Sequence, residues 1–83
     1  MKTETELRQF IVENYLYGRD DGFGEEESLL ERGILDSTGV MELIAFIEGR
    51  FGVKVEDHEL LPENLDSLAK LARFLGAKTA YAA

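Results

Sequence analysis

The sequence has no cysteine in its 83 residues. Without a thiol the chain can form no disulfide framework, no thiolate metal site and no cysteine nucleophile. Any thiol chemistry in which the protein takes part must therefore come from a group that is added to the chain.

Positive charge is also scarce, because 9 Lys and Arg residues face 17 Asp and Glu residues and leave a net charge of -8. Such a charge opposes binding to nucleic-acid phosphates and anionic membranes, and it favours protein partners with basic patches. No apolar run is long enough to span a bilayer, and residues 1–6 lack the apolar core of a signal peptide. We therefore expect a cytoplasmic protein that neither binds nucleic acid nor inserts into a membrane.

Proline and β-strand patterns are nearly absent. Pro62 is the single proline, and residues 53–55 form the only short run that alternates apolar and polar side chains. A chain of this length holds one domain with a modest core, and an isolated run of three residues has no strand to pair with. The sequence therefore predicts an all-α domain.

The strongest helical pattern lies in the middle of the chain. Its apolar residues recur at steps of three and four, the spacing of one buried stripe, and are Val40, Leu43, Ile44, Ile47 and Phe51. Asp36 precedes this helix and is expected to cap it, since its carboxylate can accept from free amides of the first turn. Gly52 follows, where a left-handed residue usually ends a helix. Ser37 is then the first helical residue, with its hydroxyl beside a turn rather than inside a packed face.

A first helix is predicted before this one, from apolar residues that end near Gly18. They are Leu7, Phe10, Ile11 and Tyr15 or Leu16. The acidic run 19–27 is interpreted as a long solvated loop with Phe23 as its only obvious anchor. Residues 28–33 then form one helical turn that a glycine closes.

The C-terminal part is expected to begin with a short helix or turn over residues 56–61, which stops before Pro62 because proline disfavours a helical residue before it. The last helix is predicted to start near Asp66, with the Asp66 side chain as its cap, and to end at Gly76. The whole prediction is a four-helix bundle with three main helices, one short helix and a long first loop.

Few residues offer chemistry of their own. Counted from Asp20, the acidic loop has Glu25 where an EF-hand needs its glycine, so no metal site is predicted. His58 is the only histidine and has no nucleophile near it in the sequence. No catalytic residue is therefore expected.

The pair Asp36 and Ser37 offers more, because residue type and position agree there. A helix start presents free amide hydrogens and positive potential, so a phosphate or phosphodiester on Ser37 would be stabilised. The alternative is that Ser37 is an ordinary residue of the first turn after an aspartate cap. The residues alone leave both interpretations open.

Residues 29–37, followed by 40–44 and 48–53, resemble the acyl carrier protein family and its peptidyl and D-alanyl carrier relatives. Residues 77–83 have no periodic apolar face and are expected to form a flexible tail. The resemblance implies a discrete, non-catalytic acyl carrier domain over residues 1–76. It also implies that 4'-phosphopantetheine from coenzyme A is attached to Ser37, beside Asp36. Partner enzymes would recognise the helix that starts at Ser37, and Glu42 matches an acidic position that is commonly used in that recognition.

A second aspartate and serine pair competes with this assignment, because Asp66 and Ser67 followed by leucine match the family's usual triplet more literally. The family needs a full helix, a short helix and a closing helix after its serine. Ser37 meets this requirement, whereas Ser67 opens the last helix. The resemblance therefore favours Ser37.

The first turn departs from the family pattern, because Thr38 replaces the usual leucine and Gly39 a bulkier residue. This variant is similar to D-alanyl carriers and some freestanding specialised carriers, and it argues against a role in general fatty-acid synthesis. The outward face is mixed rather than strongly acidic. The residues expected to take part in partner recognition are Thr38, Gly39, Met41, Glu42, Ala45 and Glu48.

The function that the resemblance implies is to hold an acyl or aminoacyl group as a thioester and deliver it between enzymes of lipid or secondary metabolite biosynthesis. The expected partners of the monomeric carrier are a phosphopantetheinyl transferase, an acyl or aminoacyl ligase or synthase, and a downstream acyltransferase. The alternative is a helical adaptor with Ser37 unmodified or phosphorylated. In that case Met41, Ala45 and Phe46 would form the partner groove.

Overall fold

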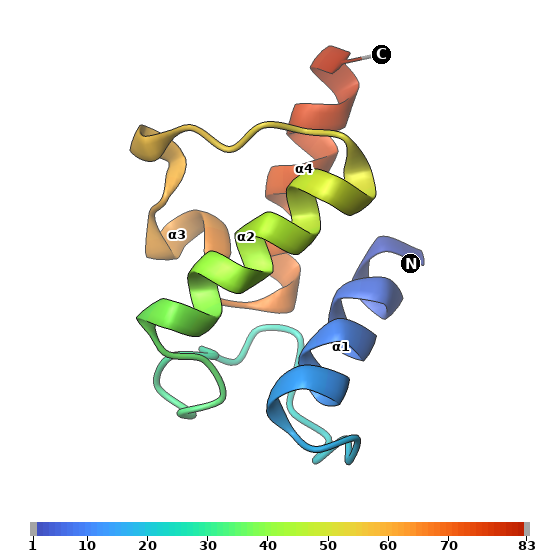
Figure 1. Cartoon of the computed structure of the whole chain (residues 1–83), viewed down its shortest axis with the longest axis vertical. Helices are drawn as coiled ribbons and strands as arrows, with labels where there is room; N and C mark the ends of the chain where they lie inside the picture. Colours follow the sequence, from blue (N-terminus) through green and yellow to red (C-terminus); the bar gives the residue numbers. More distant parts are fainter. Residues whose placement is uncertain (1, 83) are drawn as a thin grey trace.

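The structure, a computed structural model, describes the backbone of residues 2–82 and the side chains of residues 3–79. Four α-helices follow one another along the chain, namely α1 (Lys2–Tyr15), α2 (Ser37–Phe51), α3 (Pro62–Leu65) and α4 (Leu68–Ala82). A 3₁₀ turn, η1 (Asp57–Glu59), lies between α2 and α3, and the described residues include no strand (Figure 1). The predicted all-α bundle with three main helices, one short helix and a long first loop is therefore confirmed.

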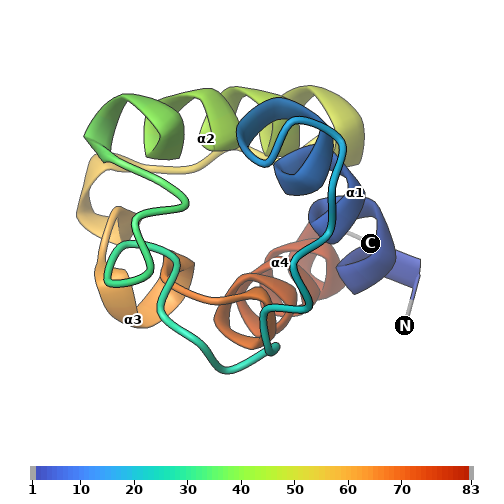
Figure 2. The ribbon, with the colours of Figure 1, turned by 90° about the horizontal axis from the view of Figure 1, so that it is seen from below.

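The helices surround one apolar core (Figure 2). Each helix contributes apolar residues to it, the first loop adds Phe23, Leu29 and Leu35, and the segment after α2 adds Val55. The buried apolar residues of the core are Leu7, Ile11, Val12, Phe23, Leu29, Leu35, Leu43, Ile44, Ile47, Val55, Leu65, Leu68, Leu71 and Leu75. The core fixes where α2 begins, because Leu35 is buried immediately before the α2 cap.

The predicted boundaries of α2 are confirmed. Asp36 has an extended backbone, and its carboxylate Oδ1 accepts from the Gly39 amide at 2.8 Å. At the other end Gly52 adopts a left-handed conformation with φ 67°, and its amide donates to the Glu48 carbonyl. Both ends therefore satisfy backbone groups that a helix leaves without partners.

The predicted short helix or turn that stops before Pro62 is confirmed by η1, which ends at Glu59, but a further helix, α3, begins at Pro62 itself and was not predicted. Proline is accepted at the first helical position because the amide hydrogen it lacks would have no partner there. The preceding segment contains only the η1 turn.

The predicted cap and the predicted end of the last helix were wrong, whereas its start at Leu68 lies near the predicted Asp66. The helix runs on through Gly76 as far as Ala82. Its first turn is capped by Ser67, whose Oγ accepts from the Lys70 amide at 3.1 Å, and not by Asp66. The division into a domain over 1–76 and a flexible tail over 77–83 stays a prediction, with Ala83 outside the described residues.

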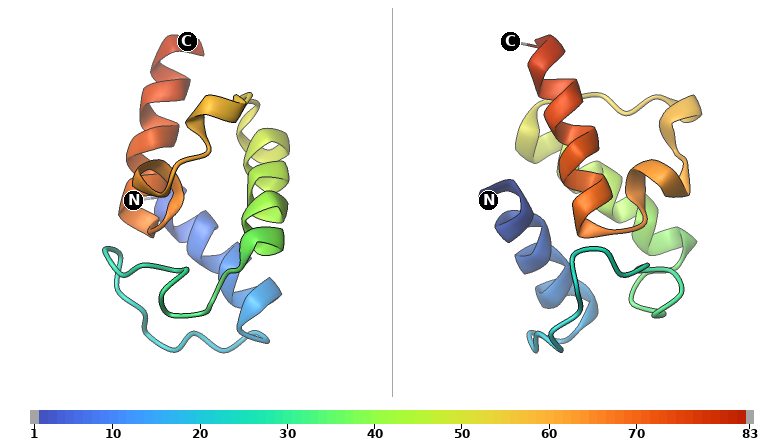
Figure 3. Two further views of the ribbon diagram at one scale, coloured as in Figure 1. Left: turned by 90° about the vertical axis from the view of Figure 1, so that its left-hand side faces the viewer. Right: turned by 180° about the vertical axis from the view of Figure 1, so that it is seen from behind.

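Asp66 instead fastens the first loop to the junction of α3 and α4. Its carboxylate accepts from the Ser28 hydroxyl and from the Leu30 amide, and its backbone carbonyl accepts from the Leu29 amide. The loop crosses the end of the bundle that lies opposite the last turns of α4 (Figure 3). These bonds hold the segment that leads into α2.

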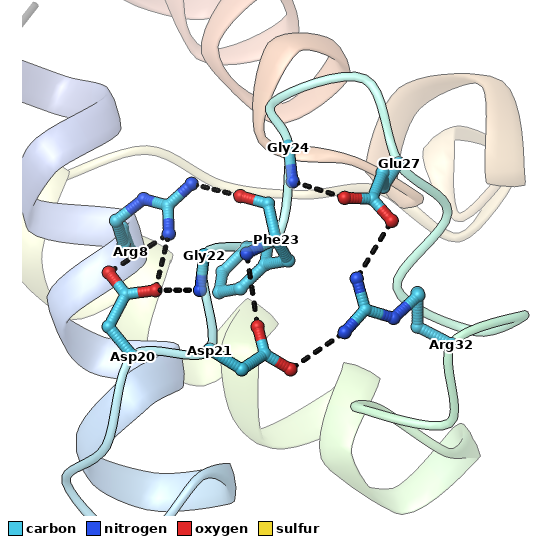
Figure 4. Close-up of polar contacts among 8 residues, drawn as sticks. All are labelled: Arg8, Asp20, Asp21, Gly22, Phe23, Gly24, Glu27 and Arg32. Carbon is cyan, nitrogen blue, oxygen red and sulfur yellow. Dashed lines mark hydrogen bonds and ion pairs between the residues drawn. The ribbon is translucent and has the colours of Figure 1, made fainter.

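The acidic half of the loop is held by two arginines (Figure 4). Arg8 of α1 donates to both carboxylate oxygens of Asp20, at 2.8 and 3.0 Å, and to the Phe23 carbonyl. Its guanidinium also lies 4.1 Å from the centre of the buried Phe23 ring. Arg32 pairs with Asp21 and Glu27, each at 2.7 Å. Phe23 is the anchor that the sequence predicted, and the arginine contacts were not predicted.

The loop carboxylates give stability that depends on pH. The Gly24 amide and then Arg32 hold the pKa of Glu27 below its ordinary value of 4.5, so the native state stabilises the charged form. This contribution is complete above pH 4.5 and is lost as the pH falls through the lower, folded pKa. We expect Arg32→Gln to lower the urea midpoint at pH 7 and to weaken the pH dependence below 4.5.

The matched control for this prediction is Arg73→Gln, which removes from α4 a positive charge that is also exposed. Urea denaturation followed by circular dichroism measures both variants between about pH 3 and pH 7, a range that includes the ordinary pKa values of aspartate and glutamate. Equal losses in the two variants would show that net charge, and not the ion pairs with Asp21 and Glu27, stabilises the loop.

Candidate functional site

The first turn of α2 presents its side chains to solvent. Asp36, Ser37 and Thr38 are all exposed, and Ser37 is the first helical residue after the Asp36 cap. No acidic residue lies in the first turn itself. The position predicted for Ser37, at a helix start and outside the core, is therefore confirmed.

The cap at Asp36 makes a prediction about stability. Asp36→Ala removes the acceptor of the Gly39 amide and should lower the free energy of unfolding by about 1 kcal/mol. Asp36→Asn keeps a side-chain oxygen in the same place and should lose only a few tenths of a kcal/mol, from the weaker interaction with the helix dipole. Urea denaturation measures both, and equal losses would indicate that the charge of Asp36 matters rather than its hydrogen bond.

A tyrosine packs directly behind this turn. The Tyr15 hydroxyl of α1 donates to Oε1 of Glu42, and the Gly39 carbonyl oxygen lies 3.3 Å away from it. Burial, followed by the hydrogen bond and charge of Glu42, raises the pKa of Tyr15 to about 12. Sequence reasoning had treated Tyr15 only as a core residue, and no periodicity could have revealed a bond between residues 27 positions apart.

Gly39 makes this approach possible. A Cβ added to Gly39 would lie 3.2 Å from Leu35 Cδ2 and 3.3 Å from Tyr15 Cε1, which is closer than nine in ten real Cβ contacts, so these neighbours would have to shift. Gly39 is buried. The structure thus gives a packing reason for a glycine in the first turn of a helix, where glycine is otherwise unfavourable.

The remaining residues predicted for partner recognition divide into two kinds. Thr38, Met41 and Ala45 are exposed, Met41 to 55%. Glu48 is half-buried, and its Oε2 accepts from the Val55 amide at 2.9 Å, which ties the segment after α2 back to the helix. The exposed face of α2 therefore combines small, apolar and acidic side chains, and Glu48 has a structural contact.

An apolar cavity of about 120 Å³ opens beside the first two turns of α2. Residues of α2, α3 and the end of the first loop line it, including Leu30, Leu35, Val40, Met41, Leu61 and Leu65. Three of these, Leu30, Met41 and Leu61, are also among the most exposed large apolar side chains of the described residues. The surface beside the first two turns of α2 therefore includes an apolar hollow, which sequence periodicity could not show because three elements build it.

The other two serines of the chain are bound within the fold. Ser67 is 1% exposed and accepts from the Lys70 amide. Ser28 is half-buried, donates to Asp66 and accepts from the Glu31 amide at 3.1 Å. Of the three serines in the sequence, Ser37 is the exposed one.

The remaining candidates for chemistry are the single histidine and the carboxylates. His58 is exposed on η1. Within the described part of the chain, no three acidic or histidine side chains are grouped to hold a metal ion. Helices long and apolar enough to cross a membrane are likewise not found among the residues described.

Fold and site together define a small helical carrier domain with an exposed serine at the capped start of its second helix. A family model described as "phosphopantetheine attachment site" matches residues 11–75. This is most of the chain, so the protein belongs to the phosphopantetheine attachment site family. It is a non-catalytic carrier that bears 4'-phosphopantetheine covalently on a serine.

One similar solved chain comes from a structure titled "Crystal structure of FAD-dependent dehydrogenase". It is 38% identical, with a TM-score of 0.72, and the match covers 82% of this chain and 96% of that one. The matched chain is therefore itself about the size of this carrier domain. No curated protein matches the sequence.

Proposed function

We propose that Ser37 is the serine that carries the 4'-phosphopantetheine arm. The observation that supports this most is exposure, because Ser28 and Ser67 are both engaged in hydrogen bonds that hold the fold together. The start of α2 also suits the group chemically. A phosphodiester on Ser37 adds a negative charge at the positive end of the helix, where free amides and the helix dipole stabilise anions.

The attachment reaction needs only the hydroxyl from this chain. Ser37 Oγ attacks the phosphorus next to pantetheine in coenzyme A and loses its proton to the transferase. A phosphodiester bond forms, the pyrophosphate bond of coenzyme A breaks, and the adenosine bisphosphate leaves. Asp36 keeps the first turn of α2 in place through its bond to the Gly39 amide.

The carrier then holds an acyl or aminoacyl group for its partner enzymes. The arm supplies the thiol that the sequence lacks, and the cargo is bound to it as a thioester. Tethering raises the effective concentration of the cargo at each partner. The proposed partners are a phosphopantetheinyl transferase, a loading ligase or synthase, and a downstream acyltransferase. The cytoplasmic location, the pathway and the monomeric state stay predictions.

The proposed partner surface is the exposed part of α2 and the rim of the cavity beside it. Thr38, Met41, Glu42 and Ala45 would touch the partner directly, with Gly39 and Glu48 supporting them through their contacts inside the fold. Charge and apolar packing would both contribute, because the acidic Glu42 and the large exposed apolar side chain of Met41 lie within two turns of Ser37.

A flavin enzyme is a further proposed partner. The support is the similar chain of carrier size in the structure titled as an FAD-dependent dehydrogenase. Such an enzyme would remove two hydrogens from the tethered group and reduce its own FAD. Binding of the arm-bearing protein to that dehydrogenase, measured by calorimetry, tests this proposal, and no heat of binding would contradict it.

The test of the carrier function is an intact mass measurement. The purified protein is incubated with coenzyme A and a broad-specificity phosphopantetheinyl transferase, and one phosphopantetheine should be gained on the peptide that contains Ser37. A folded protein that gains no phosphopantetheine would contradict the proposal and favour the alternative function, a helical adaptor with Ser37 unmodified or phosphorylated. The groove suggested for that adaptor is not supported by the structure, because Phe46 is stacked on Phe10 with ring centres 4.2 Å apart.

A further inference from the structure

Helix α2 contains two acidic residues, Glu42 and Glu48, and they differ in availability. Glu48 is half-buried and accepts from the Val55 amide. Glu42 is exposed and lies five positions after Ser37. Glu42 is therefore the carboxylate of α2 that a basic side chain of a partner can reach.

Glu42 is also held in one orientation by a contact with α1. Its Oε1 accepts from the Tyr15 hydroxyl, which belongs to another helix. The Tyr15 ring is itself fixed, because it packs edge to face on Phe10, which stacks on Phe46. The close approach of the ring depends on Gly39, which has no side chain to push it away. The carboxylate is thus bonded to a donor that cannot move freely.

This bond leaves the charge of Glu42 in place. Tyrosine donates a hydrogen without becoming charged, and the high pKa of Tyr15, about 12, keeps it a donor at any pH at which enzymes work. A carboxylate has about four acceptor positions, so one hydrogen bond leaves room for a bidentate pair with an arginine. The arrangement fixes the side chain without neutralising it.

A side chain fixed in advance loses less conformational freedom when a partner binds. Ordering one flexible side chain at an interface weakens binding by about 2-fold to 10-fold. We propose that Tyr15 is a positioning residue for modification of Ser37, and that it holds Glu42 ready to pair with a basic side chain of the phosphopantetheinyl transferase. This inference rests on the proposed attachment at Ser37.

The test is the steady-state kinetics of arm transfer, followed by mass. Tyr15→Phe keeps the ring and removes the hydroxyl, and it should raise KM for the carrier by about 2-fold to 10-fold with kcat unchanged. Glu42→Gln should raise KM at least as much. In the double variant, Tyr15→Phe should add nothing to Glu42→Gln, because the tyrosine acts through the carboxylate.

Two further variants sharpen the test. Tyr17→Phe is the matched control, since Tyr17 lies two residues after the end of α1 and is 97% exposed, and its KM should equal that of the wild type. Gly39→Ala places a Cβ 3.2 Å from Leu35 Cδ2 and 3.3 Å from Tyr15 Cε1, and it should raise KM where the Tyr15 ring, rather than Leu35, gives way. Thermal unfolding by circular dichroism confirms that each variant is folded at the assay temperature.

The outcomes separate this inference from the proposed function. If the wild type gains no phosphopantetheine at Ser37, the proposed function is overturned and this inference with it. If the wild type is modified but Tyr15→Phe has the wild-type KM, the inference alone is wrong. Additive effects of Tyr15→Phe and Glu42→Gln would also overturn it, because they would show that the hydroxyl acts by another route.

Discussion

Ser37→Ala is expected to abolish the gain of phosphopantetheine completely. The reaction needs a nucleophilic oxygen that the transferase can reach, and alanine has none. The other two serines offer no substitute, because Ser67 is 1% exposed and Ser28 is bonded to Asp66. The loss should therefore appear as a protein mass that stays unchanged however long the transferase acts.

Three controls define this result. Thr38→Ala removes a hydroxyl from the same exposed turn but keeps the Ser37 nucleophile, so it should still reach the full mass gain at long incubation even if the transfer is slower. Ser67→Ala should be modified at Ser37 as the wild type is, although loss of its cap on α4 lowers stability by about 1 kcal/mol. Ser28→Ala should also be modified. A mass gain that persists in Ser37→Ala and disappears in Ser67→Ala would reverse the assignment of the serine.

Phe23→Ala is expected to have the largest effect on stability. The Phe23 ring is 1% exposed and is the apolar anchor of the acidic loop, and it also carries the stacked guanidinium of Arg8. Replacing a buried phenylalanine by alanine lowers the free energy of unfolding by about 3–5 kcal/mol. Small domains have only about 5–15 kcal/mol in total, so the variant should be partly unfolded well below the wild-type melting temperature.

The control for this variant is Tyr17→Ala in the same connection. Tyr17 is 97% exposed, so its removal should change stability by no more than about 0.5 kcal/mol. Urea denaturation followed by circular dichroism measures both variants. A wild-type midpoint for Phe23→Ala would show that the loop is held by its arginine contacts, and that the core does not depend on the ring.

The features that the sequence predicted correctly are those that a few neighbouring residues decide. The α2 boundaries follow from Asp36 and Gly52, because a cap satisfies amides or carbonyls within one turn of itself. The anchor at Phe23 follows from one aromatic residue in a polar run. Each of these needs only local geometry and the hydrophobic effect, and both can be evaluated without knowing where the other helices lie.

The features that were missed depend on residues far apart in the chain. Asp66 was expected to cap α4 beside it, but its carboxylate bonds to Ser28 and Leu30, which the fold brings close. The first-turn amides of α4 and the donors of the distant loop compete for the same carboxylate oxygens of Asp66, and the packing of the whole chain decides which donors bind them. The start of α3 at Pro62 was missed for a different reason, because proline both ends a helix and can begin one.

The sequence by itself determined that this is an all-α domain, that α2 begins at Ser37 and that no thiol of its own can take part in chemistry. The tertiary structure decided which serine is exposed, and it placed the Tyr15 hydroxyl against Glu42 across the space that Gly39 leaves open. The physical reason is that periodicity and capping act over one or two turns. Exposure and contacts between helices are set only when the whole core has packed.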